Sequence, residues 1–173
     1  LLHNDGIFQP VAVNPKVDIA VLQYTGGTTG ISKGAALTHF NLYANTMQCK
    51  AWFRIADSPD SKSIAIIPLF HAFAMTAVMN WTLAVGGCML LEPRLDVSQL
   101  LALIGKRKPN IFIGVPTLYT ALLSHPEFSR YDLSSIKFAI AGGAPLPLAL
   151  SEEFKHRTGV TIWEGYGLSE ASP

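Results

Sequence analysis

An uncharged run is the feature of this sequence that most restricts its fold. Between Ile64 and Leu91 there is no Asp, Glu, Lys or Arg. The run is long enough to cross a bilayer, so a transmembrane helix has to be weighed. Several residues that would interrupt such a helix occur within it: Pro68, His71, Asn80 and the Gly86-Gly87 pair. We therefore interpret the run as buried elements of a soluble domain, because fully covered parallel strands also lack charged residues.

The spacing of apolar residues and turn signals predicts strands that alternate with helices. Strands are predicted at 19–24, 64–67, 88–91, 111–113, 136–141 and 160–163. Helices are predicted from Thr38, at 71–85, after Asp96, from Pro116 and at 147–156. This alternation predicts an α/β fold with a mostly parallel sheet of about five to seven strands and helices on both faces.

The sequence of the first predicted helix shows a capping residue at its start and an apolar stripe along one face. Thr38 is a residue type that caps helices through its hydroxyl group. Phe40, Tyr43, Met47 and Ala51 fall on one stripe, as on a helix that packs by one face.

Charged residues are balanced in sign and few in number. Lys and Arg number 13 and Asp and Glu number 12, which gives a net charge of +1. This balance argues against a nucleic-acid-binding module and against a polybasic membrane anchor. Charged residues make up 14% of the chain, whereas soluble domains typically have roughly 25%. We therefore expect a chain that contacts a membrane or is partly covered by further segments of a larger protein.

Cysteine and histidine usage indicates a reducing compartment. Cys49 and Cys88 form neither a CxxC pair nor a disulfide framework. The five histidines lack the spacing of metal ligands, and no signal peptide is visible. We expect a cytoplasmic protein, with a peripheral contact at the inner face of the membrane as an option for the full-length protein.

The segment with the strongest chemical signal is YTGGTTGISKG, from Tyr24 to Gly34. Its glycines let the backbone approach a ligand, its Thr and Ser residues add hydroxyl donors, and Lys33 adds a positive charge. Such a loop after a strand suits phosphate oxygens. It is not a Walker A loop, because Lys33 lies three residues beyond Gly30 and is followed by Gly34 rather than by Ser or Thr.

Further motifs, in matching order, give the sequence a family resemblance. The Tyr24–Gly34 segment resembles the phosphate loop of the adenylate-forming, AMP-producing acyl-CoA synthetase superfamily. Gly142–Leu146 (GGAPL) resembles its adenine-binding turn, and Gly165–Glu170 (GYGLSE) resembles its aromatic-Gly-x-Thr-Glu motif. Pro68–His71 (PLFH) resembles the segment that places an aromatic residue or His near the acyl carboxylate. With Gly114–Phe128, the sequence is most similar to bacterial long-chain fatty acid–CoA ligases.

The resemblance implies a reaction and the residues that perform it. A long-chain fatty acid is activated with ATP to the acyl-adenylate and then converted to acyl-CoA, with Mg²⁺ as the metal and coenzyme A as co-substrate. The implied catalytic residues are Lys33, Ser169 and Glu170, of which Glu170 holds Mg²⁺. The implied nucleotide- and phosphate-binding residues are Thr25, Gly26, Gly27, Thr28, Thr29, Gly30, Lys33, Gly142, Gly143, Ala144, Pro145, Gly165, Tyr166, Gly167 and Ser169. The implied acyl-site residues are His71, Gly114, Val115 and Pro116.

Two positions depart from the family pattern. Ser32 stands where the family commonly has Pro, which should loosen the loop without removing its donors. Ser169 stands where the family usually has Thr, and it keeps the hydroxyl group.

Other functions stay open. The substrate could be another carboxylate, such as an aryl, medium-chain or amino acid, although no acidic partner for an amino acid's ammonium group is evident. A nucleotide-binding module without catalysis is a further alternative, against which Lys33 and the Ser169-Glu170 pair argue.

The resemblance places residues 1–173 inside the large N-terminal ATP- and acyl-binding domain, without the small C-terminal domain. It implies that the ribose-binding Asp, the hinge and the catalytic Lys of the C-terminal domain lie outside this segment. We expect the segment to be inactive alone, to expose apolar patches and to self-associate.

Overall fold

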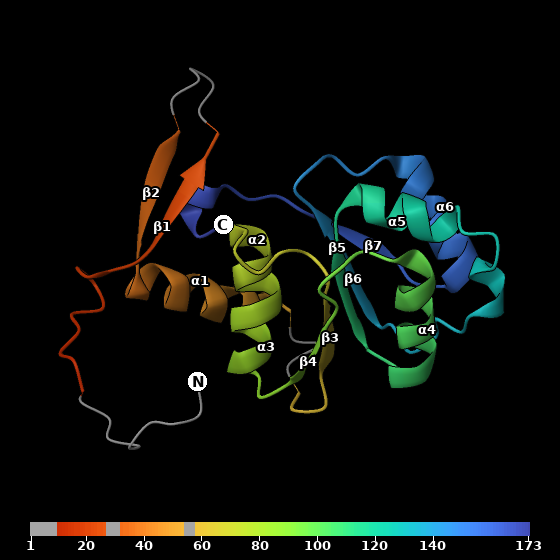
Figure 1. The fold of residues 1–173 in the computed structure, drawn as a ribbon, viewed down its shortest axis with the longest axis horizontal. Helices are drawn as coiled ribbons and strands as arrows, with labels where there is room; N and C mark the ends of the chain where they lie inside the picture. Colours follow the sequence, from red (N-terminus) through yellow and green to blue (C-terminus); the bar gives the residue numbers. More distant parts are fainter. Residues whose placement is uncertain (1–9, 27–31, 54–57) are drawn as a thin grey trace.

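The computed structural model describes residues 10–26, 32–53 and 58–173. Its elements in chain order are β1 (Ile19–Thr25), β2 (Lys33–Thr38), α1 (His39–Trp52), β3 (Lys62–Ala65), α2 (Ala72–Ala74), the π-helix η2 (Met75–Asn80), α3 (Trp81–Ala84), β4 (Cys88–Leu91), α4 (Val97–Arg107), β5 (Ile111–Gly114), α5 (Pro116–Leu123), the 3₁₀ helix η3 (Phe128–Arg130), β6 (Phe138–Gly142), α6 (Leu148–Thr158), β7 (Ile162–Gly165) and the 3₁₀ helix η4 (Ser169–Ala171). They form a sheet flanked by helices and a separate two-stranded hairpin (Figure 1).

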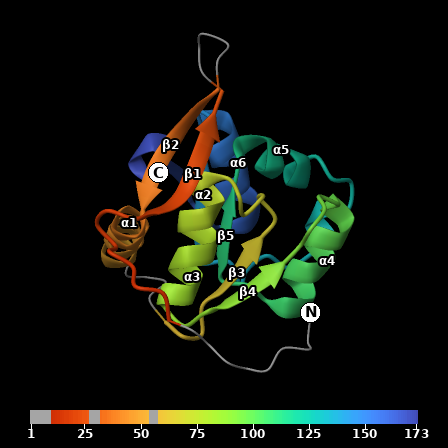
Figure 2. The same cartoon turned by 60° about the vertical axis from the view of Figure 1, so that its left-hand side comes forward.

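The central sheet has five strands in the order β4-β3-β5-β6-β7, and all of its pairs are parallel. Helices α4 and α5 cover one face, while α1 and α3 lie on the other side (Figure 2). Alternate strand residues supply the two cores. Phe112 and Ala139 belong to the core with α4, α5 and α6, whereas Ile113 and Ile140 belong to the core with η2 and α3. The predicted α/β fold with a parallel sheet and helices on both faces is confirmed.

The uncharged run folds as predicted, into a strand, a helical segment and a strand. Strand β3 covers Lys62–Ala65 instead of the predicted 64–67, and β4 has the predicted bounds. The helical segment is not one regular α-helix, because a π-helix at Met75–Asn80 separates α2 from α3. No helix in the described parts of the chain is both long and apolar enough to cross a membrane.

The two ends of the glycine- and threonine-rich segment lie in paired strands, a hairpin that the sequence did not predict. β1 pairs with β2 antiparallel, with Tyr24 opposite Gly34 and Thr25 opposite Lys33. The predicted strand at 19–24 therefore belongs to this hairpin and not to the parallel sheet. The hairpin stands beside the sheet, and α1 begins directly after it (Figure 1).

Helix α1 begins at the predicted cap. The Thr38 side chain accepts from the Asn41 backbone N–H at 3.2 Å, and the Asn41 side chain accepts from the Thr38 N–H at 2.9 Å. The apolar stripe of Phe40, Tyr43 and Met47, however, is exposed. The inward face carries Thr46 and Cys49 instead, so the stripe does not mark the face that packs on this sheet.

Candidate active site

The glycines predicted to contact ligands end adjacent strands of the sheet. Gly114 ends β5, Gly142 ends β6 and Gly165 ends β7. Gly142 is paired with Gly165, and Ala141 is paired with Gly114. Parallel strands direct their carboxyl ends to one edge, where open α/β sheets bind ligands. The fold therefore gathers the glycine-rich turns at one edge of the sheet.

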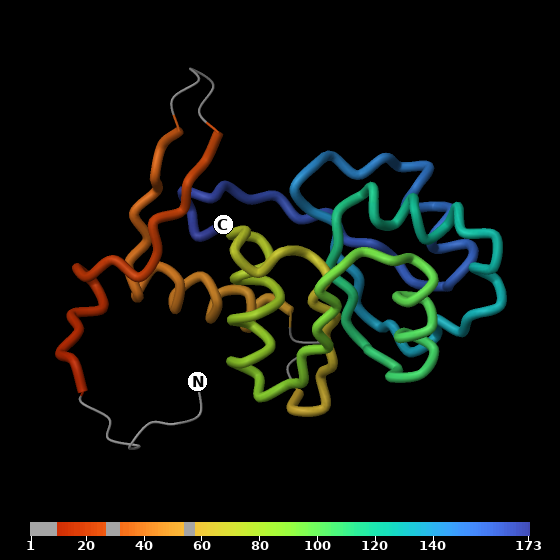
Figure 3. Tube along the Cα trace, in the orientation of Figure 1, coloured from red at the N-terminus to blue at the C-terminus, as the bar shows by residue number. Residues whose placement is uncertain are grey.

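The chain after β7 brings the Ser169-Glu170 motif to the hairpin. Thr25 Oγ1 lies 3.4 Å from Glu170 Oε1, although the two residues are 145 positions apart. The same hydroxyl lies 3.5 Å from the Lys33 carbonyl oxygen, and Ser32 Oγ donates to the Thr25 carbonyl at 3.3 Å. The end of the chain lies beside the hairpin and α2 (Figure 3). A hydroxyl group of the glycine- and threonine-rich segment and the carboxylate of the Ser169-Glu170 motif thus lie side by side, next to the backbone of Lys33.

The predicted phosphate-binding residues of the loop are described in part. Gly27, Thr28, Thr29 and Gly30 lie outside the described residues. Gly26 is exposed where the described part of the hairpin ends, and Lys33 is exposed on the opposite strand.

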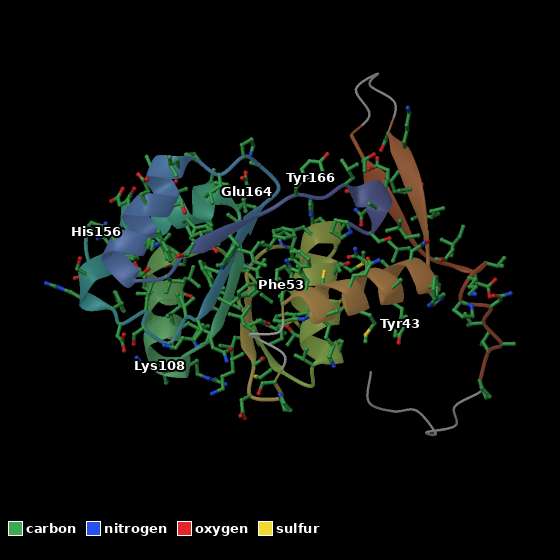
Figure 4. All side chains as sticks on the ribbon, turned by 180° about the vertical axis from the view of Figure 1, so that it is seen from behind. Tyr43, Phe53, Lys108, His156, Glu164 and Tyr166 are labelled. Carbon is green, nitrogen blue, oxygen red and sulfur yellow. The ribbon has the colours of Figure 1, made fainter. Side chains whose placement is uncertain are left out.

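The turn after β6 borders a first cavity, which we call the turn cavity. Its volume is about 280 Å³, and it is lined by Gly143, Ala144, Pro145, Glu164, Gly165, Tyr166 and Gly167. Gly143 has a φ of +78°, a conformation that glycine adopts without strain. Tyr166 is 91% exposed, so its ring is free to pack on a flat ligand. Glu164 and Tyr166 lie on the segment that leads from the sheet toward the hairpin (Figure 4).

A second cavity, the inner cavity, lies next to the Ser169-Glu170 motif. Its volume is about 150 Å³, and it is lined by Cys49, Phe53, His71, Phe73, Ala77, Ile140, Gly143, Gly165, Tyr166, Gly167, Ser169 and Pro173. His71 caps α2 by accepting from the Phe73 N–H at its Nδ1, 3.3 Å away. A neutral His71 ring then carries its proton on Nε2 and can donate from it.

A third cavity, the outer cavity, adjoins the inner one through shared walls. Its volume is about 360 Å³, and its lining is Trp52, Phe53, Phe138, Ile140, Trp163, Glu164 and Gly165. Phe53, Ile140 and Gly165 line both cavities. Phe53 lies at the end of α1 (Figure 4), with its ring centroid 4.9 Å from that of Phe138. The Phe53 ring therefore borders both apolar cavities.

Comparison with known proteins decides the family. The profile described as AMP-binding enzyme matches residues 3–173. The chain belongs to the AMP-binding enzyme family.

Among similar AMP-binding enzymes, a long-chain-fatty-acid–CoA ligase of Bacillus subtilis is 50% identical over 93% of this chain and 29% of its own length. A feruloyl-CoA synthase of an Amycolatopsis species is 37% identical over 90% of this chain and 31% of its own. The crystal structure of a long-chain-fatty-acid-CoA ligase (FadD1) from Archaeoglobus fulgidus has a TM-score of 0.82 at 31% identity, and it covers 96% of this chain and 35% of that one. The chain thus spans under a third of the length of these two curated relatives.

The predicted acyl-site residues at the end of β5 and directly after it, Gly114, Val115 and Pro116, do not line the three cavities. Gly114 and Pro116 are buried. A side chain at Gly114 would meet Leu118 Cδ2 at 3.0 Å, so close packing against α5 accounts for this glycine. Val115 is half-buried, and its Cγ1 would lie 3.7 Å from a Cβ at Gly143. Their role in acyl binding stays a prediction.

Some residues of the site were not predicted from the sequence. Glu164 Oε1 accepts from the Leu146 N–H at 2.9 Å and so holds the turn of the turn cavity in place. Cys49 and Phe53 reach the inner cavity from α1, where burial raises the pKa of the Cys49 thiol. The pairing of Ala141 with Glu164 brings that carboxylate beside the turn, and this register is not visible in the sequence.

Proposed function

We propose that this chain forms the ATP- and acyl-binding part of an AMP-forming long-chain fatty acid–CoA ligase. The observation that carries the proposal is the meeting of Thr25 with Glu170 at 3.4 Å. This contact joins the phosphate-loop motif and the acidic motif beside a cavity lined by His71 and Ser169. One site can then hold a polyphosphate and a carboxylate together.

In the first step, an oxygen of the fatty carboxylate attacks the α-phosphorus of ATP. The bond from that phosphorus to the bridging oxygen breaks, and pyrophosphate leaves. Catalysis of such a transfer is chiefly positioning and stabilisation of charge on phosphoryl oxygens. Lys33 and the donors of the Thr25–Lys33 loop bind the β- and γ-phosphates, Ser169 donates to the α-phosphate, and Tyr166 packs on adenine over the Gly142–Pro145 backbone.

The residues at the motif fit a magnesium ion. Mg²⁺ prefers oxygen ligands and in such sites takes one or two carboxylates together with substrate phosphates and water. Glu170 is exposed and offers one carboxylate, with the Thr25 hydroxyl beside it. Glu170 would hold the ion, which when bound neutralises charge on the phosphates.

The two apolar cavities supply room for an acyl chain. The carboxylate end would lie near His71, which can donate from Nε2 to a carboxylate oxygen. The chain would extend through the inner cavity past Phe53 into the outer cavity, whose lining is mostly apolar or aromatic. Burial of methylene groups there would supply about 0.8 kcal/mol for each one.

A second candidate substrate is an aryl acid, since a feruloyl-CoA synthase is 37% identical to this chain. A panel of acids separates the candidates. The full-length protein is incubated with ATP, Mg²⁺, coenzyme A and either palmitate, oleate or ferulate, and the CoA esters are measured by mass spectrometry. CoA esters of palmitate or oleate support the proposal, whereas feruloyl-CoA alone would replace it.

Calorimetry of ATP binding in the presence and absence of Mg²⁺ tests the metal site. Glu170→Gln should lose most of the dependence on Mg²⁺ because it removes the ion's carboxylate ligand. Equal dependence in both proteins would refute the role of Glu170. ATP binding with normal Mg²⁺ dependence but without ester formation from any acid would favour the non-catalytic nucleotide-binding module.

The rest of the reaction needs parts of the protein beyond residues 1–173. We place this segment inside the large N-terminal domain, with the small C-terminal domain completing thioester formation. In that second step the coenzyme A sulfur attacks the acyl carbonyl carbon, and AMP leaves. We also propose a cytoplasmic enzyme that takes its fatty acid through peripheral contact with the inner face of the membrane.

A further inference from the structure

The Ser169-Glu170 motif is tied to the π-helix by one buried hydrogen bond. Thr76 Oγ1 donates to the Ser172 carbonyl oxygen at 2.6 Å, and the two residues are 96 positions apart. Thr76 is 1% exposed and Ser172 is 3% exposed, so water does not compete for this bond. A buried hydrogen bond of this kind costs most when one partner is removed and the other is left without one.

The bonded residue has an unusual backbone conformation. Ser172 has a φ of +87°, which is uncommon for a residue other than glycine. A residue in such a conformation persists where the surrounding structure holds it there, and positions of this kind are concentrated at active sites. The Ser172 N–H also donates to the Ser169 carbonyl at 3.3 Å. The strained residue therefore closes the turn that carries Ser169 and Glu170.

The turn is fixed on two sides. On the hairpin side, Thr25 Oγ1 approaches Glu170 Oε1 at 3.4 Å. On the sheet side, the Thr76 hydroxyl holds the Ser172 carbonyl. The first contact involves exposed groups that an ATP phosphate and a metal ion can reach, whereas the second is buried.

Thr76 does not line the inner cavity, although its neighbour in η2, Ala77, does. π-Helical turns of this kind occur frequently at functional sites. Adjacent residues of η2 therefore have different neighbours: Ala77 borders the inner cavity, and the Thr76 hydroxyl bonds to the Ser172 carbonyl.

We propose that Thr76 is a positioning residue for adenylation: its hydroxyl holds Ser172 and so sets where Ser169 and Glu170 meet the phosphates and Mg²⁺ of ATP. This inference rests on the proposed function, because it assigns Ser169 and Glu170 to ATP. Thr76 would contact no substrate itself and would act through the turn that carries Ser169 and Glu170.

The test compares three variants of the full-length protein. Thr76→Val removes the hydroxyl at nearly constant volume, and Thr76→Ser keeps it. Thr82→Val is the matched control, because Thr82 is buried on the following helix and its hydroxyl bonds with Ser63 at 2.6 Å, away from the motif. Adenylation is followed by exchange of labelled pyrophosphate into ATP, and hydrogen exchange is followed in peptides that cover residues 165–173.

We expect Thr76→Val to lower kcat for the exchange about tenfold and to raise the KM for ATP, while the KM for the fatty acid stays within about twofold. Thr76→Ser should restore kcat, and Thr82→Val should leave it unchanged even if thermal stability falls. Hydrogen exchange at 165–173 should speed up only in Thr76→Val.

The hydrogen-exchange readout separates the two possible failures. If the wild-type protein adenylates no acid, the proposed function fails, yet faster exchange at 165–173 in Thr76→Val would still show that Thr76 holds the turn. If wild type is active and Thr76→Val matches it in kcat and in hydrogen exchange, the positioning role of Thr76 is overturned. Equal losses in Thr76→Val and Thr82→Val would also overturn it, because they would show a general loss of stability.

Discussion

At Gly142, the structure gives a reason for glycine that the sequence did not. The resemblance assigns it to the adenine-binding turn, but a Cβ at this position would lie 2.8 Å from Cζ of Phe73. Real Cβ atoms do not approach this closely, so the Phe73 ring would have to move. Phe73 lines the inner cavity. Glycine is therefore needed here because of the Phe73 ring that borders the inner cavity.

Gly142→Ala is therefore predicted to act on the fatty acid. The displaced Phe73 ring should narrow the inner cavity and raise the KM for a long-chain acid about tenfold, with a change in the KM for ATP below about threefold. Steady-state kinetics of the full-length protein measure both constants. Gly142→Ala combined with Phe73→Leu should recover part of the loss. An effect confined to ATP would contradict this account.

Tyr119 stabilises the sheet through its hydroxyl group. The buried phenol donates to the backbone and lies 3.0 Å from the Phe112 carbonyl and 2.8 Å from the Ile140 carbonyl, so it ties β5 to β6. Burial raises the pKa of Tyr119 well above its usual value. Because the folded-state pKa exceeds the unfolded one, this stabilisation is fully present below the unfolded-state pKa of about 10 and is lost as pH rises from there through the folded-state pKa.

Tyr119→Phe should lower the free energy of unfolding by about 1–2 kcal/mol near neutral pH, because two buried carbonyls lose a donor. The difference in melting temperature between wild type and Tyr119→Phe should shrink as the pH rises above about 10. Tyr43→Phe is the control, since Tyr43 is 60% exposed. A difference that grows with pH would refute the assignment.

At the scale of elements, the parallel sheet was predictable because its strands are short apolar runs bounded by turn signals. Strand β2 was not predictable, because its sequence KGAALT has no β-branched residue before Thr38. Its antiparallel pairing with β1 also departs from the parallel sheet that was predicted. The apolar stripe on α1 did not predict the buried face of the helix, because apolar periodicity shows which residues share a face and not what covers that face. The π-helix lies within an apolar run whose composition does not reveal it.

The sequence motifs of the candidate site were predictable, but the contacts between its residues were not. The glycine-rich turns and Ser169-Glu170 are visible as local sequence patterns. Glu164 and Thr76 are not, because each acts through a partner that the fold supplies from elsewhere in the chain. The position of Phe53 was not predictable either, because its contact with two cavities depends on how α1 ends against the sheet.

Phe53 at the end of α1 should control the length of acyl chain that is accepted. Phe53→Trp should narrow the passage and lower kcat/KM for palmitate about tenfold relative to octanoate, whereas Phe53→Leu should raise that ratio. The measurement is kcat/KM across a series of saturated acids. Phe154→Leu is the matched control, because Phe154 is buried in the core on the opposite face of the sheet. An unchanged ratio in both Phe53 variants would contradict the proposed path.

At the scale of the whole molecule, the scarcity of charge agrees with the apolar surface of this segment. Tyr43 is 60% exposed, Trp52 83%, Leu83 65% and Trp163 58%. The isolated 173-residue chain is therefore predicted to self-associate, because exposed apolar patches of this kind favour association. Sedimentation velocity over a range of concentrations measures this. A single monomeric species at every concentration would refute the prediction.

We propose that the hairpin and the Ser169-Glu170 turn form one site, at which a fatty carboxylate is joined to AMP. Exchange of labelled pyrophosphate into ATP by the full-length protein tests it most directly, because the exchange requires the adenylate to form and reverse. We expect exchange that depends on both a long-chain acid and Mg²⁺ and that falls at least about 100-fold in Glu170→Gln. Exchange that needs no acid, or that is as fast in Glu170→Gln as in wild type, would contradict it.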